Sequence, residues 1–254
     1  MGQASFDRGD SALKPNFDVG SVKIIACATV IEEMLPLMPS RMAYEVLDFG
    51  LHLDPDKLKQ SLQQAIDSTD PSIETIVLGF GLCAMAVVGL EARERTLIIP
   101  RTDDCIGIFL GSREAYEEQS SREPGTYYLT KGWIEVNDTP LEEYRRMEER
   151  YGTERATRMM KLLLKNYTRI AYIDTGLKDQ ERYREYAQEV ARFFDLKYEE
   201  ILGSNGLVRQ MLFGPWDDET FVVVEPGERI TYAQFKTTAT TTSNLNILNL
   251  DTGS

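Results

Sequence analysis

The chain has 254 residues, of which 42% are hydrophobic and 27% charged, a composition typical of a folded globular protein. Its formal net charge of −13 repels nucleic-acid phosphates and anionic membrane surfaces, so we expect neither as a partner. Three cysteines do not suggest a secreted disulfide framework, and we see no apolar leader or membrane-spanning run, so we expect a cytoplasmic protein.

Strands and helices alternate through the first half of the chain. Thr29 and Glu32 have the spacing of a capping box, and Glu33 beside them is expected to face solvent. Thr102 can cap a later helix. Apolar runs predict strands at 22–28, 44–49, 73–78 and 96–100. This order predicts an α/β fold with an open, mostly parallel sheet that carries helices on both faces.

The second half is less regular. Strands are predicted at 169–174 and 220–224, and a strand or an extended loop at 125–130, with charged amphipathic helices between them. We interpret residues 21–236 as a single α/β domain, and a boundary near 135–152 is the alternative. We expect a flexible N-terminal segment, residues 1–20, and a disordered Thr/Asn-rich tail, residues 237–254.

Three cysteines follow three different predicted strands. Cys27 ends the first strand, Cys83 lies just past the third, and Cys105 lies just past the fourth. Because the C-terminal ends of parallel strands share one edge, where ligands bind, the thiols are expected to converge there. Each also precedes or enters a predicted helix, whose N-terminus favours the thiolate form.

Three thiolates suit a zinc ion, or an iron–sulfur cluster with one iron left open for substrate. No C-x-x-C pair supports either choice. The competing interpretation is three separate core cysteines, since free cysteine is among the most buried residue types. His52, the single histidine, follows the second strand and is a candidate fourth ligand or proton-transfer group, or an ordinary loop residue.

The glycines after the third strand match a dinucleotide fingerprint. Gly79-x-Gly81-x-x-Ala84 follows a predicted strand, and Asp103 lies about 20 residues on, where an acid that binds ribose is expected. The same glycines could instead bring the backbone close to a ligand beside Cys83. Gly79 and Gly81 are therefore candidate cofactor-binding residues.

Further candidate residues lie near these motifs. Asp104 could orient a ligand, act as a base or cap the next helix. Lys131 and Trp133 belong to an aromatic and basic segment that can wall a pocket and hold an anion, although an extended strand with alternating aromatic residues gives the same pattern. We count His52, Asp104 and Lys131 as candidate catalytic residues and Trp133 as a candidate cofactor contact.

Several motifs together resemble a family of uncharacterised domains found in methanogenic archaea and anaerobic bacteria, often encoded beside corrinoid-dependent methyltransferases. The motifs are LGFGLC at 78–83, PR at 100–101, DCI at 104–106, LGS at 110–112, PGTYY at 124–128 and GW at 132–133. The resemblance covers residues 22–235 and implies anaerobic one-carbon metabolism with methyl-group or corrinoid handling, without an established reaction. It includes Cys83 and Cys105, which favours a shared cysteine site.

The leading hypothesis is a metal- or iron–sulfur-binding protein with Cys27, Cys83 and Cys105 as ligands. It would act on a small-molecule substrate as a lyase or transferase. The first alternative is a non-enzymatic accessory protein that docks a corrinoid methyltransferase or corrinoid protein and meets the corrinoid through that partner. The second is a nucleotide-binding enzyme that uses Gly79 and Gly81.

Overall fold

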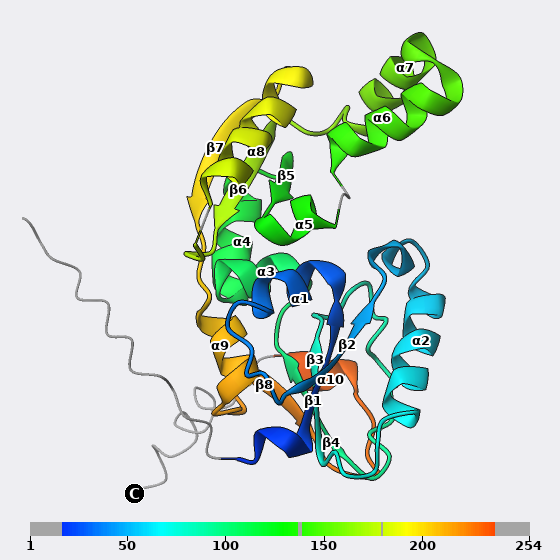
Figure 1. Ribbon diagram of the computed structural model, residues 1–254, viewed down its shortest axis with the longest axis vertical. Helices are drawn as coiled ribbons and strands as arrows, with labels where there is room; N and C mark the ends of the chain where they lie inside the picture. Colours follow the sequence, from blue (N-terminus) through cyan, green and yellow to red (C-terminus); the bar gives the residue numbers. More distant parts are fainter. Residues whose placement is uncertain (1–16, 137–138, 179, 237–254) are drawn as a thin grey trace, which may run out of the picture.

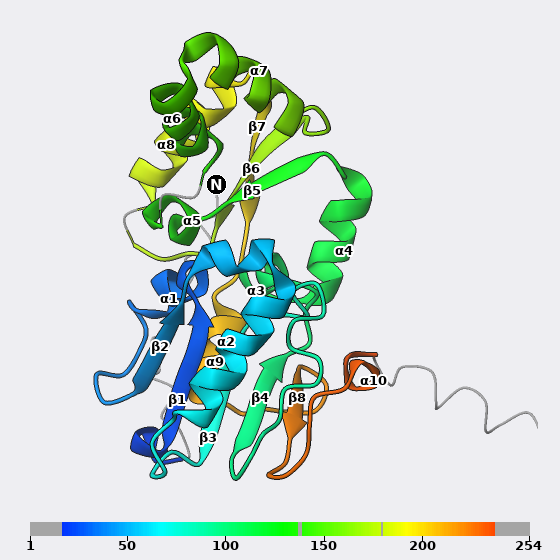
Figure 2. The same ribbon diagram turned by 90° about the vertical axis from the view of Figure 1, so that its right-hand side faces the viewer.

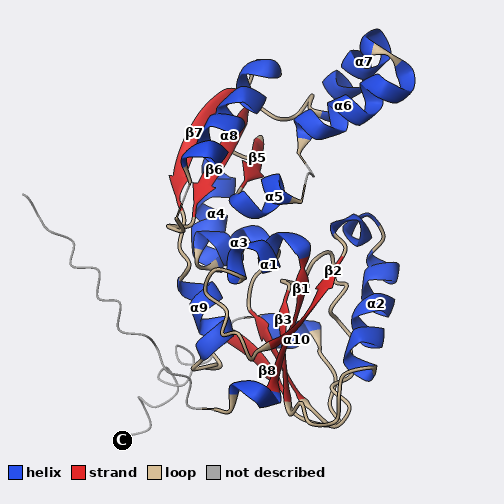
Figure 3. Ribbon diagram, in the orientation of Figure 1, coloured by secondary structure: helices blue, strands red, loops and turns tan. Residues whose placement is uncertain are grey.

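Two β-sheets, one of five strands and one of three, organise the chain (Figures 1 and 3). The computed structural model describes residues 17–136, 139–178 and 180–236. The predicted tail at 237–254, and residues 1–16 of the predicted N-terminal segment, lie outside the described residues. Helices and mostly parallel strands confirm the predicted α/β class.

The elements follow one another in the order expected for this class. The part that precedes residue 112 contains η1 (Val19–Ser21), β1 (Val22–Cys27), α1 (Ala28–Met34), β2 (Ala43–Leu47), η2 (Phe49–Leu53), α2 (Pro55–Asp67), β3 (Thr75–Gly79), β4 (Thr96–Pro100) and α3 (Cys105–Leu110). The remainder contains α4 (Arg113–Arg122), β5 (Thr126–Leu129), α5 (Lys131–Glu135), α6 (Pro140–Tyr151), α7 (Thr153–Leu163), β6 (Arg169–Asp174), α8 (Glu181–Phe193), β7 (Lys197–Leu202), α9 (Gly206–Phe213), β8 (Phe221–Val224) and α10 (Tyr232–Phe235).

The five-stranded sheet, sheet A, has the order β2-β1-β3-β4-β8. Its first four strands are parallel, and β8 pairs with β4 in the antiparallel direction. The inner strands are apolar and buried on both faces, as parallel strands between helices require. Helix α2 covers one face and α9 the other (Figure 2), and α2 buries Leu58, Leu62 and Ile66.

The three-stranded sheet, sheet B, has the order β5-β6-β7, all parallel. Strand β7 was not predicted, because its sequence KYEEIL is polar and lies mostly exposed at the sheet edge. Helix α8 packs on β6 and β7 through Tyr183, Ala187, Val190 and Ala191. The expected single open sheet is thus divided into two, while the division into domains stays a prediction.

One continuous hydrophobic core connects the two sheets. It includes Ile24 and Ile98 from sheet A together with Ile170 and Ile201 from sheet B. The parallel strands of the two sheets point toward one another, so that their C-terminal ends meet across α1, α3 and α5 (Figures 1 and 2). By the rule for open α/β sheets, the layer between the two sheets is where a site is expected.

Helices α6 and α7 form a hairpin that projects beside sheet B (Figure 1). A small separate cluster of Tyr144, Ala156, Met160 and Leu164 holds the two helices together. Within the part of the chain that the structure describes, no helix combines the length and the apolar character needed to cross a membrane.

Candidate functional site

The three cysteines lie at the C-terminal ends of three neighbouring strands of sheet A. Cys27 ends β1 and is the N-cap of α1, Cys105 begins α3, and Cys83 lies in the turns after β3. All three are free and buried. The charge of Cys27 raises the pKa of both Cys83 and Cys105, behind the larger effect of burial, so the thiols lie within electrostatic range of one another.

The sulfur atoms nevertheless do not form a ready-made site for a single ion. Among the described residues, no group of three or more His, Cys, Asp or Glu side chains is arranged to hold a metal ion. The strand order therefore brings the thiols to one edge of the sheet. Their side chains do not form the tight group that a single metal ion requires.

Burial raises the pKa of all three thiols. It brings that of Cys83 to about 12 and places that of Cys105 well above its ordinary value. At Cys27 burial also dominates, although hydrogen bonds from Thr29 and from the backbone of Val30 oppose it. The expectation that helix N-termini keep these thiols ionised is therefore wrong, because desolvation outweighs the backbone N–H groups.

The backbone at Cys83 is strained. Cys83, Ala84 and Met85 have consecutive positive φ angles of 44°, 54° and 72°. Each non-glycine residue in this left-handed region costs roughly 1–2 kcal/mol. The N–H of Cys83 donates to the Asp103 carbonyl at 2.9 Å, and that of Ala86 donates to the Cys83 carbonyl at 3.1 Å. Such strain is typical of segments retained for function.

The two glycines of the fingerprint serve close packing. A Cβ at Gly79 would lie 2.3 Å from Ala26 Cβ, and one at Gly81 would lie 2.6 Å from the Thr102 carbonyl oxygen. Residues 83–89 form turns in place of a helix. The helix N-terminus that a dinucleotide pyrophosphate requires therefore does not follow these glycines, and Cys83 does not precede a helix as expected.

Asp104 is the N-cap of α3. Its carboxylate accepts from the N–H of Ile106 at 2.9 Å, which is the capping role that sequence reasoning offered for it. Burial raises the pKa of Asp104, against the hydrogen bonds from Ile106 and from Tyr116. Thr102 was expected to cap this helix and does not; its buried hydroxyl has no hydrogen-bond partner among the described residues.

His52 lies in an aromatic cluster between the sheets. Its ring stacks on Phe49 and Phe80 at centroid distances of 5.0 and 6.1 Å, and its Nδ1 lies 2.9 Å from the Phe49 carbonyl oxygen. If Nδ1 carries the proton, Nε2 is an acceptor, and Nε2 is buried with no partner among the described residues. Trp133 contacts Phe49 and Phe109 edge to face, so it fills the same layer.

An apolar cavity of about 390 Å³ opens beside this cluster. His52 and Phe49 line one side, and the residues of the α6–α7 hairpin line another. His52 is among its lining residues, although its Nε2 atom itself is buried.

Lys131 and Glu33 join the two halves of the molecule. Lys131 Nζ donates to the Glu32 carbonyl at 2.9 Å and pairs with the Glu32 carboxylate at 3.2 Å. Glu33 is 1% exposed and accepts from the Gly132 N–H at 3.0 Å and from the Thr175 hydroxyl at 2.7 Å. Burial raises the pKa of Glu33. The expectation that Glu33 faces solvent is wrong, because helix α5 covers it.

Sequence reasoning missed Thr175 altogether, because no pattern connects it with Glu33 more than a hundred positions earlier. The expected capping box at Thr29 is also wrong. Thr29 lies inside α1, its hydroxyl is 3.3 Å from the Cys27 sulfur, and Glu32 faces Lys131.

Comparison with known proteins places the chain in a family. No curated protein and no solved structure matches it. A family model described as "Protein of unknown function (DUF1638)" matches residues 46–212. The matched stretch contains Cys83, Cys105 and Asp104, while Cys27 precedes it. Because the match spans more than half of the chain, the protein belongs to the DUF1638 family.

Proposed function

We propose that the protein binds an iron–sulfur cluster through Cys27, Cys83 and Cys105. The observation that carries the proposal is the delivery of three free, buried thiols by three neighbouring strands, within electrostatic range of one another. Three thiols that follow three neighbouring strands lie at the edge where ligands of α/β sheets bind.

A bound cation would lower the pKa values of the thiols, which burial raises in its absence. Without one, burial and mutual repulsion keep Cys83 and Cys105 protonated, because thiolates there would lack compensating charge. Iron coordination deprotonates cysteine thiols outright, and the same low-dielectric surroundings then strengthen the attraction between thiolate and metal. The raised pKa values therefore predict that binding is linked to proton release.

A cluster suits these thiols better than a single zinc ion does. Zinc holds each of its sulfur ligands at about 2.3 Å, which requires a tight group. No described group of three His, Cys, Asp or Glu side chains is arranged in that way. A cluster gives each thiolate its own iron and so accepts ligands that lie farther apart.

The strained segment supports a functional role for Cys83. Three successive left-handed residues fix the direction of its side chain beside Asp104, whose charge raises the pKa of the thiol. A segment selected for stability alone would place glycine at one or more of these positions.

Three cysteine ligands leave one iron of a four-iron cluster without a protein ligand. Such an iron supplies Lewis-acid chemistry for a lyase or transferase that acts on a small molecule. His52 and Asp104 are the candidate groups for exchanging a proton with that substrate. The setting in reducing cytoplasm and in corrinoid-dependent methyl metabolism rests on composition and on the family resemblance.

The test is anaerobic purification followed by reconstitution with iron and sulfide. We expect about four iron ions and four sulfides per chain, the content of a four-iron cluster. The variants Cys27→Ser, Cys83→Ser and Cys105→Ser should each lose most of the iron while they keep the wild-type circular dichroism spectrum. Met85→Leu is the matched control, because Met85 lies in the same turn with a 45% exposed side chain.

Wild-type protein that stays free of iron after reconstitution would refute the proposal. Stoichiometric zinc that all three serine variants lose would replace the cluster by a zinc site. Iron that persists in the three variants would show that other residues hold it.

A further inference from the structure

Strand β2 leaves one edge of sheet A open. It pairs with β1 along its whole length, and no other strand in the described part of the chain pairs with it. Figure 2 shows β2 at the outer edge of the sheet. The backbone N–H and C=O groups that face away from β1 are therefore able to bind another strand.

The side chains of β2 do little to protect this edge. Tyr44 and Val46 lie two positions apart, so they point to the same face of the sheet, and they are 48% and 44% exposed. The one charged residue in the strand is Glu45, whose carboxylate pairs with Lys23 Nζ of β1 at 2.7 Å. Edge strands that avoid pairing commonly carry lysine, proline or a bulge, and β2 has none of these.

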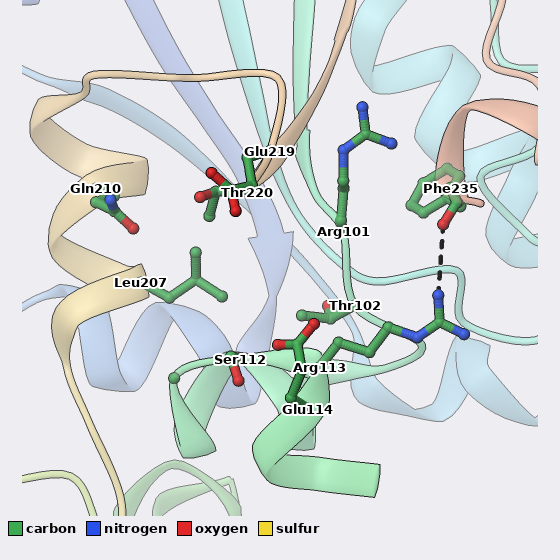
Figure 4. A pocket seen from close by; sticks show the side chains of 11 residues that line it. Arg101, Thr102, Ser112, Arg113, Glu114, Leu207, Gln210, Glu219, Thr220 and Phe235 are labelled. Carbon is green, nitrogen blue, oxygen red and sulfur yellow. Dashed lines mark hydrogen bonds between the residues drawn. The ribbon is translucent and has the colours of Figure 1, made fainter. Parts of the chain in front are cut away.

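The opposite edge strand of sheet A, β8, differs in this respect. The residues that precede β8 line a cavity of about 290 Å³. Figure 4 shows the charged side chains of Arg101, Glu114 and Glu219 around that cavity. Charged side chains at a sheet edge oppose the approach of a second strand. Of the two edge strands of sheet A, β2 is therefore the one suited to pairing.

The charges that flank β2 are complementary to one another. Arg41 precedes the strand and Asp48 follows it, and both side chains are exposed. Arg41 forms no ion pair with a described residue. Asp48 accepts from the N–H of Gly50 at 2.8 Å through one carboxylate oxygen, which leaves its other oxygen for a cation.

A closed two-fold pair of this edge is antiparallel, so the start of one β2 lies beside the end of the other. Arg41 of each copy then comes close to Asp48 of the other copy. The face that carries Tyr44 and Val46 continues into the same face of the second copy, where aromatic and β-branched side chains stabilise each other across strands. The edge is thus self-complementary in charge, in apolar surface and in backbone hydrogen bonding.

We propose that β2 pairs with β2 of a second copy of this chain. The two five-stranded sheets then form one continuous sheet across a two-fold axis. Each Glu45 carboxylate keeps its ion pair with Lys23, which reduces the repulsion between the two glutamates at the contact. The contact does not involve the cysteines, and it does not depend on the proposed cluster.

Sedimentation velocity of the full chain is the test. We expect wild-type protein at about 100 µM to sediment with twice the mass of one chain, in rapid exchange with monomer, because a single strand pair forms a small interface of the transient kind. Val46→Lys should be a monomer at the same concentration. It should keep the wild-type circular dichroism spectrum, because the side chain is exposed in the single chain.

A charge exchange tests the antiparallel direction. Arg41→Glu and Asp48→Lys each create two like-charge contacts per dimer and should weaken the dimer by about tenfold or more. An equimolar mixture of the two variants should dimerise again, because the introduced glutamate then faces the introduced lysine and the native arginine faces the native aspartate. The matched control is Arg158→Glu, which changes the net charge equally at an exposed position of α7 and should leave the dimer unchanged.

Three outcomes would overturn the proposal. The first is wild-type protein that stays monomeric at about 100 µM. The second is a dimer that persists unchanged in Val46→Lys and Arg41→Glu, or a mixture of the charge variants that stays monomeric. The third comes from hydrogen exchange, in which the β2 amides should be better protected at high than at low chain concentration. Protection that does not depend on concentration would mean that the chain covers this edge itself.

Discussion

The contact between α1 and α5 offers the sharpest test of how the two sheets are joined. A Cβ at Gly132 would lie 2.1 Å from the Thr29 carbonyl oxygen and 2.9 Å from its carbonyl carbon. Both are backbone atoms, so no side-chain rotation can relieve the overlap. Gly132→Ala therefore has to push α5 away from α1 by roughly 1 Å before ordinary contact is restored.

The expected cost follows from two effects. Overpacking in a well-packed core costs about 1–3 kcal/mol. The same shift lengthens the hydrogen bond from the Gly132 N–H to Glu33, now 3.0 Å, and a typical hydrogen bond contributes about 0.5–1.5 kcal/mol. We expect Gly132→Ala to lose about 1.5–4.5 kcal/mol, a large share of the 5–15 kcal/mol typical of native proteins.

Urea unfolding measures this loss through the midpoint at constant slope. Gly206→Ala is the matched control, because Gly206 begins α9 and its nearest contact would be a side-chain oxygen of Ser204 at 3.1 Å. The control should change stability by less than about 1 kcal/mol. A loss of under about 1 kcal/mol in Gly132→Ala would mean that the two helices are not packed as described. In a double-mutant cycle, Gly132→Ala and Glu33→Gln should be non-additive, since both affect the same hydrogen bond.

Two further predictions concern strain and titration. Ala84→Gly should raise the free energy of unfolding by about 0.5–1 kcal/mol, because Ala84 has a φ of 54° and an exposed side chain. A lower free energy of unfolding in urea would contradict the backbone strain at this position. Burial raises the pKa of Glu33, so the folded protein binds the carboxyl proton more tightly than the unfolded chain does. The stability that the neutral carboxyl provides is therefore lost as pH rises from the ordinary pKa of about 4.3 through the raised pKa of the folded state. The stability of Glu33→Gln relative to wild type should therefore increase between about pH 4 and pH 7; a constant difference in thermal unfolding across this range would refute the assignment.

The strands of sheet A could be predicted because their sequences leave little choice. Runs such as VKIIAC and TLIIP are apolar, β-branched and short, which is the pattern of strands buried on both faces. Helix capping also depends on local sequence: the Asp54 carboxylate, for example, accepts from the N–H of Lys57 three residues on. Local signals of this kind also predicted that the three cysteines follow three strands.

Other features depend on residues that are distant in sequence. The edge strand β7 has a polar sequence and is a strand only because β6 pairs with it. The local sequence predicts that Glu33 faces solvent. In the folded protein it instead accepts hydrogen bonds from Gly132 and Thr175, which lie in the other half of the chain. The sequence predicts that the Thr102 hydroxyl caps helix α3. In the structure Asp104 is the cap, and the Thr102 hydroxyl has no partner among the described residues.

The sequence by itself determined the α/β class, the strands of sheet A and the positions of the cysteines along them, because periodicity and capping act within a few residues. Only the tertiary structure decided that the strands divide into two sheets facing one another, and that the thiols between them are neutral. Desolvation depends on everything that surrounds a group, including segments that are distant in sequence, so no local pattern shows it.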